Sequence, residues 1–382
     1  MKHGWPLVAL LSATATASYL CRVNVSVAGV LIMREYGLTE EAMGRIFSAF
    51  LLGYALCQFP GGALADRFGA ARTLAWAALG WVASTGLIAA AGSAVVMILI
   101  GRFLLGVAEA PTFPSAAQAI SCWIPSHQRA RANGFVIAAI GLGSGIAPPL
   151  VTFLMQRWGW RVALLITAIP ALLAALAWFA VRAPTAMTQR ESTPRRIPTS
   201  RSFVLLALSY TLQGYVGYIF VFWFYLYLVN VRHFDLLRGA LFGSLPWLLS
   251  IVSIPLGGYL FDRARRGKRW IPITGLAGSG LLLAFGAVTA SPYLAATALA
   301  LSTMLVLSVE GPFWATMTEL SGPHSGAAGG LMNMGSNIGG LISPAVTPIL
   351  AHWFGWQSAL LLSASLALLA ALLWFGITPR ES

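Results

Sequence analysis

Long apolar stretches recur along the whole chain and are separated by short polar turns. A helix needs about 20 apolar residues to cross the hydrocarbon core of a bilayer, so this pattern predicts transmembrane helices. No stretch shows the alternating apolar and polar positions of a membrane-spanning strand. Twelve transmembrane helices are expected, at residues 7–33, 42–65, 73–91, 94–122, 129–155, 158–181, 202–229, 238–262, 270–290, 293–320, 325–350 and 355–377.

The composition supports lipid as the solvent. Hydrophobic residues make up 58% of the 382 residues, and charged residues only 9%. A soluble domain carries about 25% charged residues. An all-α membrane protein is therefore expected.

The net charge of +13 raises the question of nucleic-acid binding. Of the 24 Lys and Arg residues, 16 fall on one side of the predicted helices and six on the other, while Arg22 and Arg102 lie inside them. Cytoplasmic loops of membrane proteins carry such an excess. The charge therefore predicts a multi-pass protein with cytoplasmic termini, and nucleic acid is not needed to explain it. The short loops favour a bacterial cytoplasmic (inner) membrane.

The two halves of the chain repeat each other at an offset of 196 residues. Matching positions include Gly61-Gly62 and Gly257-Gly258, Asp66-Arg67 and Asp262-Arg263, and Trp160 and Trp356. Two pseudo-symmetric six-helix repeats are therefore expected, at residues 1–181 and 202–382, joined by a cytoplasmic linker at 182–201. Parallel repeats of this kind place a solute site between the halves and switch access by rocking.

Several motifs resemble the major facilitator superfamily over the whole chain, and its anion:cation symporter family over the first half. The superfamily resemblance rests on GGALADRFGAAR (61–72) and GGYLFDRARRGKR (257–269). The family resemblance rests on RVNVSVA (22–28), IFSAFLLGYALCQFPGG (46–62), GVAEAPTFP (106–114) and SCWIPSHQRARANGF (121–135). That family includes hexuronate and aldonate carriers and the vesicular glutamate and sialic acid carriers.

The resemblance implies roles for individual residues. Arg22 and Tyr54 match positions that contact the substrate anion, and Trp314 and Asn333 match cavity positions. A cytoplasmic gate is expected at the repeated Asp-Arg pairs, Asp66 with Arg67 and Asp262 with Arg263, and at Arg129. Tyr218 shares one stripe of its helix with Tyr210 and Gly214, and it is a further candidate for substrate contact.

Arg22 is a candidate anion site on physical grounds as well. It lies in mid-span on a polar stripe with Thr14, Ser18 and Ser26, which recur every four residues and so share one helix face. An unpaired charge inside a membrane is expensive. A guanidinium fork matches the two oxygens of a carboxylate. The alternative is a structural ion pair with an acid on another helix.

Arg102 and Glu310 are candidates for proton coupling, and the main candidate is Glu109. It lies seven residues after Arg102, on the same helix face and about 10 Å along the axis, and Pro111 and Pro114 interrupt the helix just beyond it. A carboxyl group buried in a low dielectric can take up and release a proton. The alternative is a permanently paired structural glutamate. Glu310 is its approximate partner in the second repeat, at an offset of 201.

Two positions depart from the family pattern. Cys21 stands where the family commonly has an aspartate, which removes a second proton site and a counter-ion for Arg22. Ile140 stands where some sugar-acid carriers have a polar residue.

The expected function is secondary transport of a small organic anion, a carboxylate such as a sugar acid, by a monomer in symport with protons. A drug or cation antiporter of the same fold and a non-transporting sensor remain alternatives. An enzyme is not expected, because no GxSxG, HExxH or Walker motif appears. Neither a cofactor nor a metal is expected.

Overall fold

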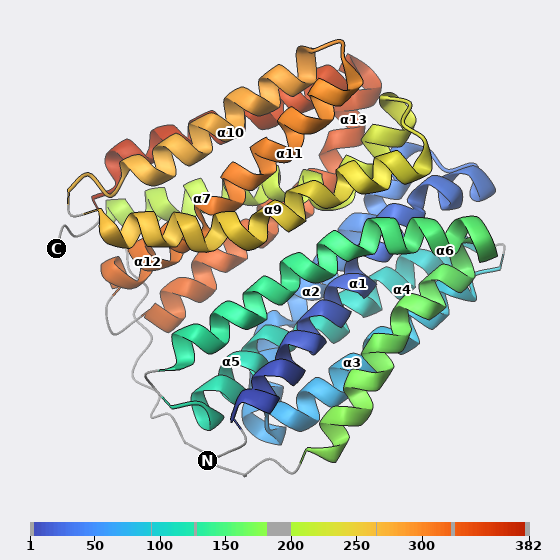
Figure 1. Ribbon diagram of the computed structural model, residues 1–382, viewed down its shortest axis with the longest axis horizontal. Helices are drawn as coiled ribbons and strands as arrows, with labels where there is room; N and C mark the ends of the chain where they lie inside the picture. Colours follow the sequence, from blue (N-terminus) through green and yellow to red (C-terminus); the bar gives the residue numbers. More distant parts are fainter. Residues whose placement is uncertain are drawn as a thin grey trace. The chain divides into compact units, whose positions relative to one another are not determined.

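The computed structural model describes residues 4–92, 94–125, 128–181, 200–264, 266–321 and 325–378. This described part is helical and contains no strand (Figure 1). The elements are α1 (Gly4–Tyr36), α2 (Glu40–Phe68), α3 (Ala70–Ala89), α4 (Val95–Glu109), α5 (Thr112–Trp123), α6 (Arg129–Ala180), α7 (Arg201–Phe222), α8 (Phe224–Leu226), the π-helix η2 (Tyr227–Val231), α9 (Leu236–Arg263), α10 (Trp270–Val288), α11 (Pro292–Ser308), α12 (Glu310–Ser321), α13 (Ser325–Leu373) and the 3₁₀-helix η4 (Trp374–Gly376).

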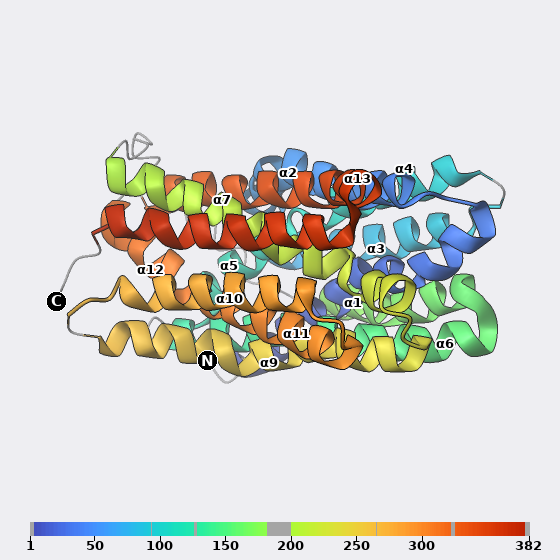
Figure 2. The same cartoon turned by 90° about the horizontal axis from the view of Figure 1, so that it is seen from above.

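The predicted spans all lie in these helices, and two pairs of spans share one element. In α6 a single residue, Gly159, leaves the helical conformation with φ 79°, and in α13 Gly355 does so with φ 80°. The ribbons of α6 and α13 each turn back on themselves (Figure 1, Figure 2). Within the described residues, eight helical stretches are long and apolar enough to cross a membrane, and two of them contain such a turn. With α2 and α3, which are also long enough, the twelve-helix prediction is confirmed.

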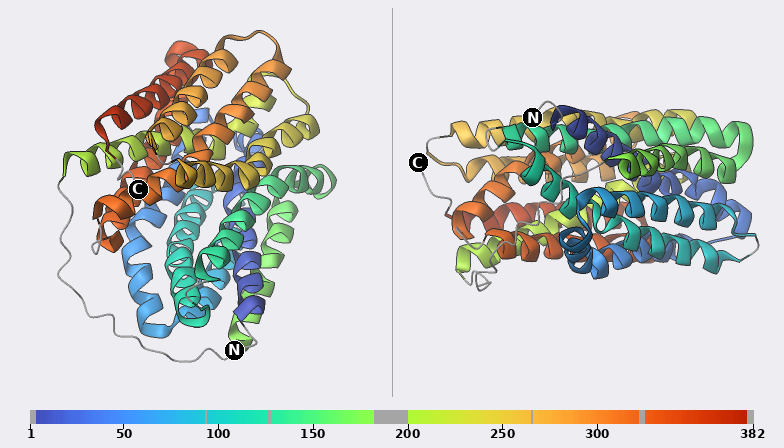
Figure 3. Two further views of the ribbon diagram at one scale, coloured as in Figure 1. Left: turned by 60° about the vertical axis from the view of Figure 1, so that its left-hand side comes forward. Right: turned by 90° about the horizontal axis from the view of Figure 1, so that it is seen from below.

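Contacts divide the chain into two compact units, residues 1–189 and 190–382. In the first unit α1 and α3 pack against α6, and α2 packs against α4. In the second unit α7 and α10 pack against α13, and α11 packs against α9 and α10. Long helices lie side by side within each unit (Figure 3). Of the expected linker, residues 182–199 lie outside the described residues.

Local sequence signals start several of these helices. Thr39 accepts a hydrogen bond from the backbone N–H of Ala42 at the start of α2, and Asp235 accepts one from Arg238 at the start of α9. Ser291 caps α11, where Pro292 follows at the first helical position. Such caps satisfy backbone donors that have no partner inside the helix.

Glycines allow close helix packing around the predicted site. A Cβ atom on Gly106 of α4 would lie 2.0 Å from the Phe50 carbonyl oxygen of α2. A Cβ atom on Gly257 of α9 would lie 1.8 Å from the Ser308 carbonyl oxygen of α11. Small residues at such crossings let backbones approach in a membrane, where no hydrophobic effect pulls helices together.

Each unit contains one span that is interrupted near its candidate acid. In the first unit α4 ends at Glu109, and α5 begins at Thr112 after Pro111. In the second unit α11 ends at Ser308, and α12 begins at Glu310. The interruption that the prolines predict after Glu109 is therefore present, and it places each carboxyl group beside a helix end.

Candidate functional site

Arg22 lies in the middle of α1 with only 3% of its surface exposed. Its Nη2 lies 2.9 Å from Glu109 Oε1, and its Nε donates to the same oxygen at 3.1 Å. Its Nη1 donates to the Tyr19 hydroxyl at 3.1 Å. The two ionisable groups that the sequence singles out separately are thus joined as one buried ion pair between α1 and α4.

Glu109 is completely buried at the end of α4. Ser18, one turn before Arg22 on the polar stripe of α1, also donates to Glu109 Oε1, at 2.5 Å. The second oxygen, Oε2, has no hydrogen-bond partner among the described residues. One carboxyl oxygen of Glu109 therefore faces both Arg22 and Ser18, and the other accepts no hydrogen bond from the described residues.

Aromatic rings surround the Arg22 guanidinium. Its Cζ lies 4.5 Å from the centroid of the Tyr19 ring, 4.9 Å from that of Phe50 and 5.1 Å from that of Tyr54. Phe50 and Tyr54 stack on each other along α2. Ring faces attract a cation without neutralising it, so they help to hold the guanidinium in place beside Glu109. The structure brings Tyr54 and Arg22 together, as the resemblance implies.

Arg102 is fully buried on α4 and contacts the backbone of α1. Its Nη1 donates to the Arg22 carbonyl oxygen at 3.1 Å, and its Cζ lies 4.7 Å from the Phe50 ring centroid. Arg102 thus fixes the backbone that carries Arg22. Its expected part in proton coupling stays a prediction.

Glu310 is held in a different way in the second unit. Its Oε2 accepts from the Tyr210 hydroxyl at 2.9 Å, and its Oε1 accepts from Gln213 Nε2 at 2.8 Å. Both donors come from α7 and both are neutral. Gln213 was not among the predicted site residues, because a lone glutamine in an apolar helix gives no signal until its partner is known.

Trp314 lies one turn after Glu310 on α12, with 38% of its surface exposed in the described structure. Its Nε1 donates to the Tyr210 hydroxyl at 3.2 Å. Tyr218 stacks on Phe222, one turn along α7, and lies against Gly340 of α13. Asn333, also on α13, is half-buried. Their expected contacts with substrate stay predictions.

The expected gate residues lie at helix ends. Arg129 donates to the carbonyl oxygens of Ile124 and Ser121 and so caps the end of α5. Arg263 donates to the Tyr259 hydroxyl, and no ion pair joins it to Asp262 within the described ranges. The Arg67 guanidinium lies over the Phe68 ring, while the side chain of Asp66 lies outside the described part of the chain. A gating role for these five residues stays a prediction.

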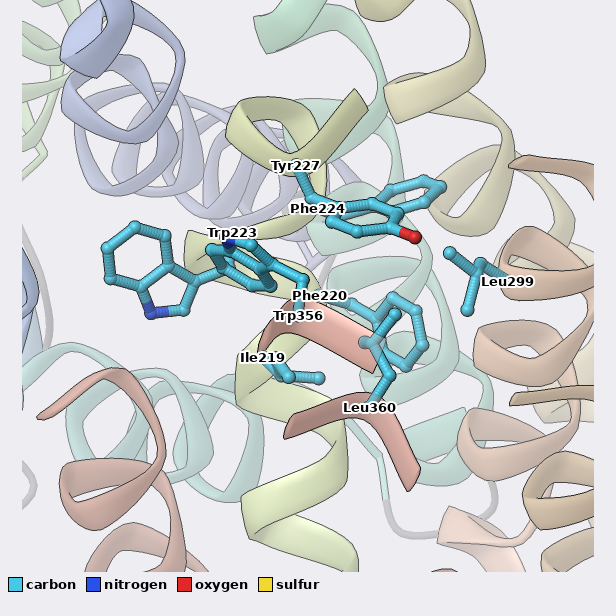
Figure 4. Close-up of a pocket in the computed structure, with 8 residues that line it drawn as sticks. All are labelled: Ile219, Phe220, Trp223, Phe224, Tyr227, Leu299, Trp356 and Leu360. Atoms are coloured by element: carbon cyan, nitrogen blue, oxygen red, sulfur yellow. The ribbon is translucent and has the colours of Figure 1, made fainter. Parts of the chain in front are cut away.

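A small pocket in the second unit contains none of the predicted site residues (Figure 4). Its lining is aromatic and aliphatic and comes from α7, α8, η2, α11 and α13. It is lined by Ile219, Phe220, Trp223, Phe224, Tyr227, Leu299, Trp356 and Leu360. Such a lining offers no charge to an anion, so the pocket is not the candidate site.

Comparison with protein families shows to which superfamily the chain belongs. The family model described as Major Facilitator Superfamily matches residues 10–334 and 317–382. The chain belongs to the Major Facilitator Superfamily. Among superfamily relatives, a probable sulfoacetate transporter of Cupriavidus necator is 32% identical, with 95% of this chain and 91% of that protein aligned. A hexuronate transporter of Bacillus subtilis is 28% identical over 97% of this chain and 94% of its own length. A D-galactonate transporter of Escherichia coli is 27% identical over 95% and 93%.

Solved structures support the superfamily fold. A bacterial homologue of the human lysosomal transporter Spinster, in an inward-facing and occupied conformation, superposes with a TM-score of 0.85 at 18% identity. The alignment covers 98% of this chain and 97% of that one. A D-xylose-proton symporter gives a TM-score of 0.81 at 17% identity, covering 98% of both chains. The predictions of family, of fold and of a membrane transporter that is not an enzyme are confirmed.

Proposed function

We propose that this chain is a secondary transporter of a small organic anion, a carboxylate such as a sugar acid or another monocarboxylate, in symport with protons. The buried Arg22 guanidinium, ringed by three aromatic side chains, is the observation that carries the proposal. Relatives named as transporters of sulfoacetate, hexuronate and D-galactonate support the same substrate class. All three named solutes are organic acids, for which a guanidinium is a matched partner.

The ion pair offers a physical basis for coupling. A substrate carboxylate that binds Arg22 competes with Glu109 Oε1 for the same N–H donors. A carboxylate that loses its cation in a low-dielectric interior is strongly destabilised, and it becomes neutral by taking up a proton, for which Oε2 is available. The anion and the proton then travel together, and release of the anion returns Arg22 to Glu109.

Cys21 bears on the number of protons. A thiol replaces the aspartate that the family commonly has before the arginine, so Glu109 alone would carry the proton of the first unit. A monoanion that travels with this one proton would move without net charge. The variant Cys21→Asp should restore a second acid beside Arg22 and add one proton per anion. Liposome reversal potentials measure that ratio, and an unchanged ratio in Cys21→Asp would contradict this account.

The membrane arrangement is part of the proposal. Two six-helix bundles, at residues 1–181 and 202–382, would exchange access by rocking about a cytoplasmic linker at 182–201, in a monomer whose termini face the cytoplasm of a bacterial cell. The observation behind the orientation is the excess of Lys and Arg on one side. Reporter fusions at residue 190 and at the C-terminus test it, and a periplasmic signal from either would reject it.

A ligand screen tests the substrate class first. Purified protein would be melted with sulfoacetate, hexuronates, aldonates, simple monocarboxylates, neutral sugars and lipophilic cations. We expect stabilisation by one or more of the anions only. Stabilisation by a lipophilic cation alone would point to the antiporter alternative, and stabilisation by a neutral sugar as strongly as by its acid would remove the role of Arg22.

Uptake into liposomes then tests coupling. With a stabilising anion and an imposed pH gradient, the natural protein should accumulate the anion, whereas Glu109→Gln should exchange it across the membrane without accumulation. A sodium gradient or a membrane potential, imposed alone, separates proton coupling from other driving forces. Undiminished pH-driven accumulation by Glu109→Gln would contradict the assignment of Glu109.

A further inference from the structure

Glu310 is a half-buried carboxyl group at the start of α12, with no cation partner among the described residues. Its oxygens accept hydrogen bonds from Tyr210 and Gln213, and the Trp314 indole also interacts with the carboxyl group; all three partners are neutral. Of the ionisable side chains on the helices packed against α12, Tyr210 is the one that contacts it. The others on these helices are Arg201, Tyr215 and Tyr218 of α7, Arg238, Tyr259, Asp262 and Arg263 of α9, Tyr293 of α11 and His352 of α13, while Glu319 of α12 pairs with Lys268.

Neutral donors do not cancel a charge. Hydrogen bonds to a carboxylate compensate for lost water, but an isolated charge in a low dielectric stays costly until it is paired or neutralised. Glu109 has the Arg22 guanidinium at 2.9 Å for this purpose. Glu310 has no such cation beside it in the described part of its unit. A proton is the smallest ligand that would neutralise it without displacing either donor.

We propose that Glu310 is a proton-binding site of the second unit, and that Tyr210 transmits its protonation to Trp314. The Tyr210 hydroxyl donates to Glu310 Oε2 at 2.9 Å and accepts from Trp314 Nε1 at 3.2 Å. Tyr210 is itself buried, and its ring packs on Phe313 at 4.9 Å between centroids. The hydroxyl is therefore fixed between the acid and the indole.

The direction of these hydrogen bonds depends on the proton. A tyrosine hydroxyl has one hydrogen to donate. When it donates to a carboxylate, the bond is charge-assisted and the oxygen becomes a better acceptor for the Trp314 N–H. When Glu310 is protonated on Oε2, its own O–H donates to Tyr210, which must turn its hydrogen elsewhere. The acceptor for Trp314 is then weaker, and the indole is held less firmly.

Trp314 would connect the protonation of Glu310 to substrate binding. If the proposed function is right and Trp314 contacts the substrate, the proton on Glu310 tunes that contact from the second unit, independently of the Arg22–Glu109 pair. The proton site and its relay can be measured with no anion present, so they do not depend on that function.

Infrared difference spectroscopy of the full chain in liposomes tests the proton site. A protonated carboxyl group has a C=O stretch that a carboxylate lacks, and it can be followed through a pH titration. We expect Glu310→Gln to lose one such titrating band, and Glu109→Gln to keep that band. A carboxyl region of Glu310→Gln that matches the natural protein at every pH would overturn the proposal. Tyr210→Phe, which keeps the acid, should retain the band with a shifted midpoint, and an unshifted midpoint would count against the relay.

Tryptophan fluorescence tests the relay. The protein has 13 other tryptophans, so the emission of Trp314 is identified by difference. It is the pH-dependent component of the fluorescence that disappears in Trp314→Phe. We expect Glu310→Gln and Tyr210→Phe to lose this component as well. The matched control is Tyr215→Phe, because Tyr215 is also buried on α7 but its hydroxyl pairs with Thr347; this variant should keep the component. Persistence of the component in Tyr210→Phe, or its loss in Tyr215→Phe, would overturn the relay.

Each result is independent of anion transport. Absence of anion binding with a titrating Glu310 would reject the proposed substrate and keep the proton site. Anion transport by a protein whose Glu310 does not titrate would keep the proposed substrate class and reject the proton site.

Discussion

The two membrane acids of this transporter take corresponding places in the two units but have different partners. Glu109 ends α4 and is paired with Arg22, whereas Glu310 begins α12 and is held by a tyrosine and a glutamine. At the offset of the repeat, the position of Arg22 is occupied by Tyr218. The duplicated fold thus keeps an acid beside a helix interruption in each half, while among the described residues only the acid of the first half is paired with a cation. Backbone geometry and local charge balance are separable properties of the repeat.

The largest expected effect comes from removing each acid in turn. Glu109→Gln leaves Arg22 buried without its counter-ion, and breaking a buried pair from one side costs about 3–5 kcal/mol. In Glu310→Gln the neutral donors Tyr210 and Gln213 face an amide in place of a carboxyl group. This change should lower the free energy of unfolding by about 1 kcal/mol. Chemical denaturation in detergent, followed by circular dichroism, measures both. Equal losses would show that the two acids do not differ as the contacts indicate.

The next effect concerns the cation. Arg22→Lys keeps the charge next to Glu109 but loses the planar guanidinium, whose Nε donates to Glu109 Oε1 and whose Nη2 lies 2.9 Å from the same oxygen. Losing a hydrogen bond to a charged group costs about 1.5–3 kcal/mol, so anion affinity should fall about 10- to 150-fold. The control is Arg131→Lys, an exposed arginine of the same unit that lies over the Trp5 ring. Normal uptake by Arg22→Lys would contradict bidentate binding.

The sequence alone predicts the elements of the first unit but not the contacts between them. Apolar run lengths predict the twelve spans, and an arginine in mid-span already indicates a polar interior. The pairing of Arg22 with Glu109 joins residues 87 positions apart, and helical periodicity gives a face but not the neighbouring helix that it meets. The sequence therefore leaves two alternatives open for Glu109, a coupling site and a permanently paired glutamate. Residue spacing within one helix does not decide between them, because it does not show which helix lies opposite.

The second unit shows the same limit more strongly. Tyr210 is on a predicted stripe, but Gln213, three residues along α7, is not. The sequence does not indicate that Gln213 contacts Glu310, because that contact depends on how α7 and α12 pack. Spans 5 and 6, and spans 11 and 12, were expected as separate helices; each pair is nearly continuous, because one glycine in a left-handed conformation makes the turn.

A smaller effect tests the helix crossing that places Phe50 and Tyr54 beside Arg22. Gly106→Ala would put a methyl group 2.0 Å from the Phe50 carbonyl oxygen, and overpacking costs about 1–3 kcal/mol. Gly134→Ala on α6 is the matched control, because nothing lies within 4 Å of its added Cβ, and there alanine should stabilise by about 0.5–1 kcal/mol. Thermal melts in detergent compare them. A harmless Gly106→Ala would mean that α2 and α4 can separate freely.

The smallest effect is expected for an ion pair of the same chemistry at the surface of the first unit. Glu35 and Arg161 lie 2.6 Å apart and are 41% and 36% exposed. Exposed pairs are worth about 0.2–1 kcal/mol and weaken with salt. A double-mutant cycle of Glu35→Gln and Arg161→Gln should give a coupling energy in this range that falls at high salt. A salt-independent value as large as that of the Arg22 pair would contradict burial as the source of the difference.

The glycine turns in α6 and α13 bear on how the chain resists proteases. Proteolytic nicking needs a stretch of exposed and adaptable backbone. At Gly159 and Gly355 the helix continues to within one residue on both sides, so no such stretch is presented, although the neighbouring Trp158 and Phe354 side chains are exposed. An enzyme that cuts membrane proteins at their connecting loops would find no extended peptide to bind at these two turns, and each pair of helical arms would survive digestion as one covalent piece.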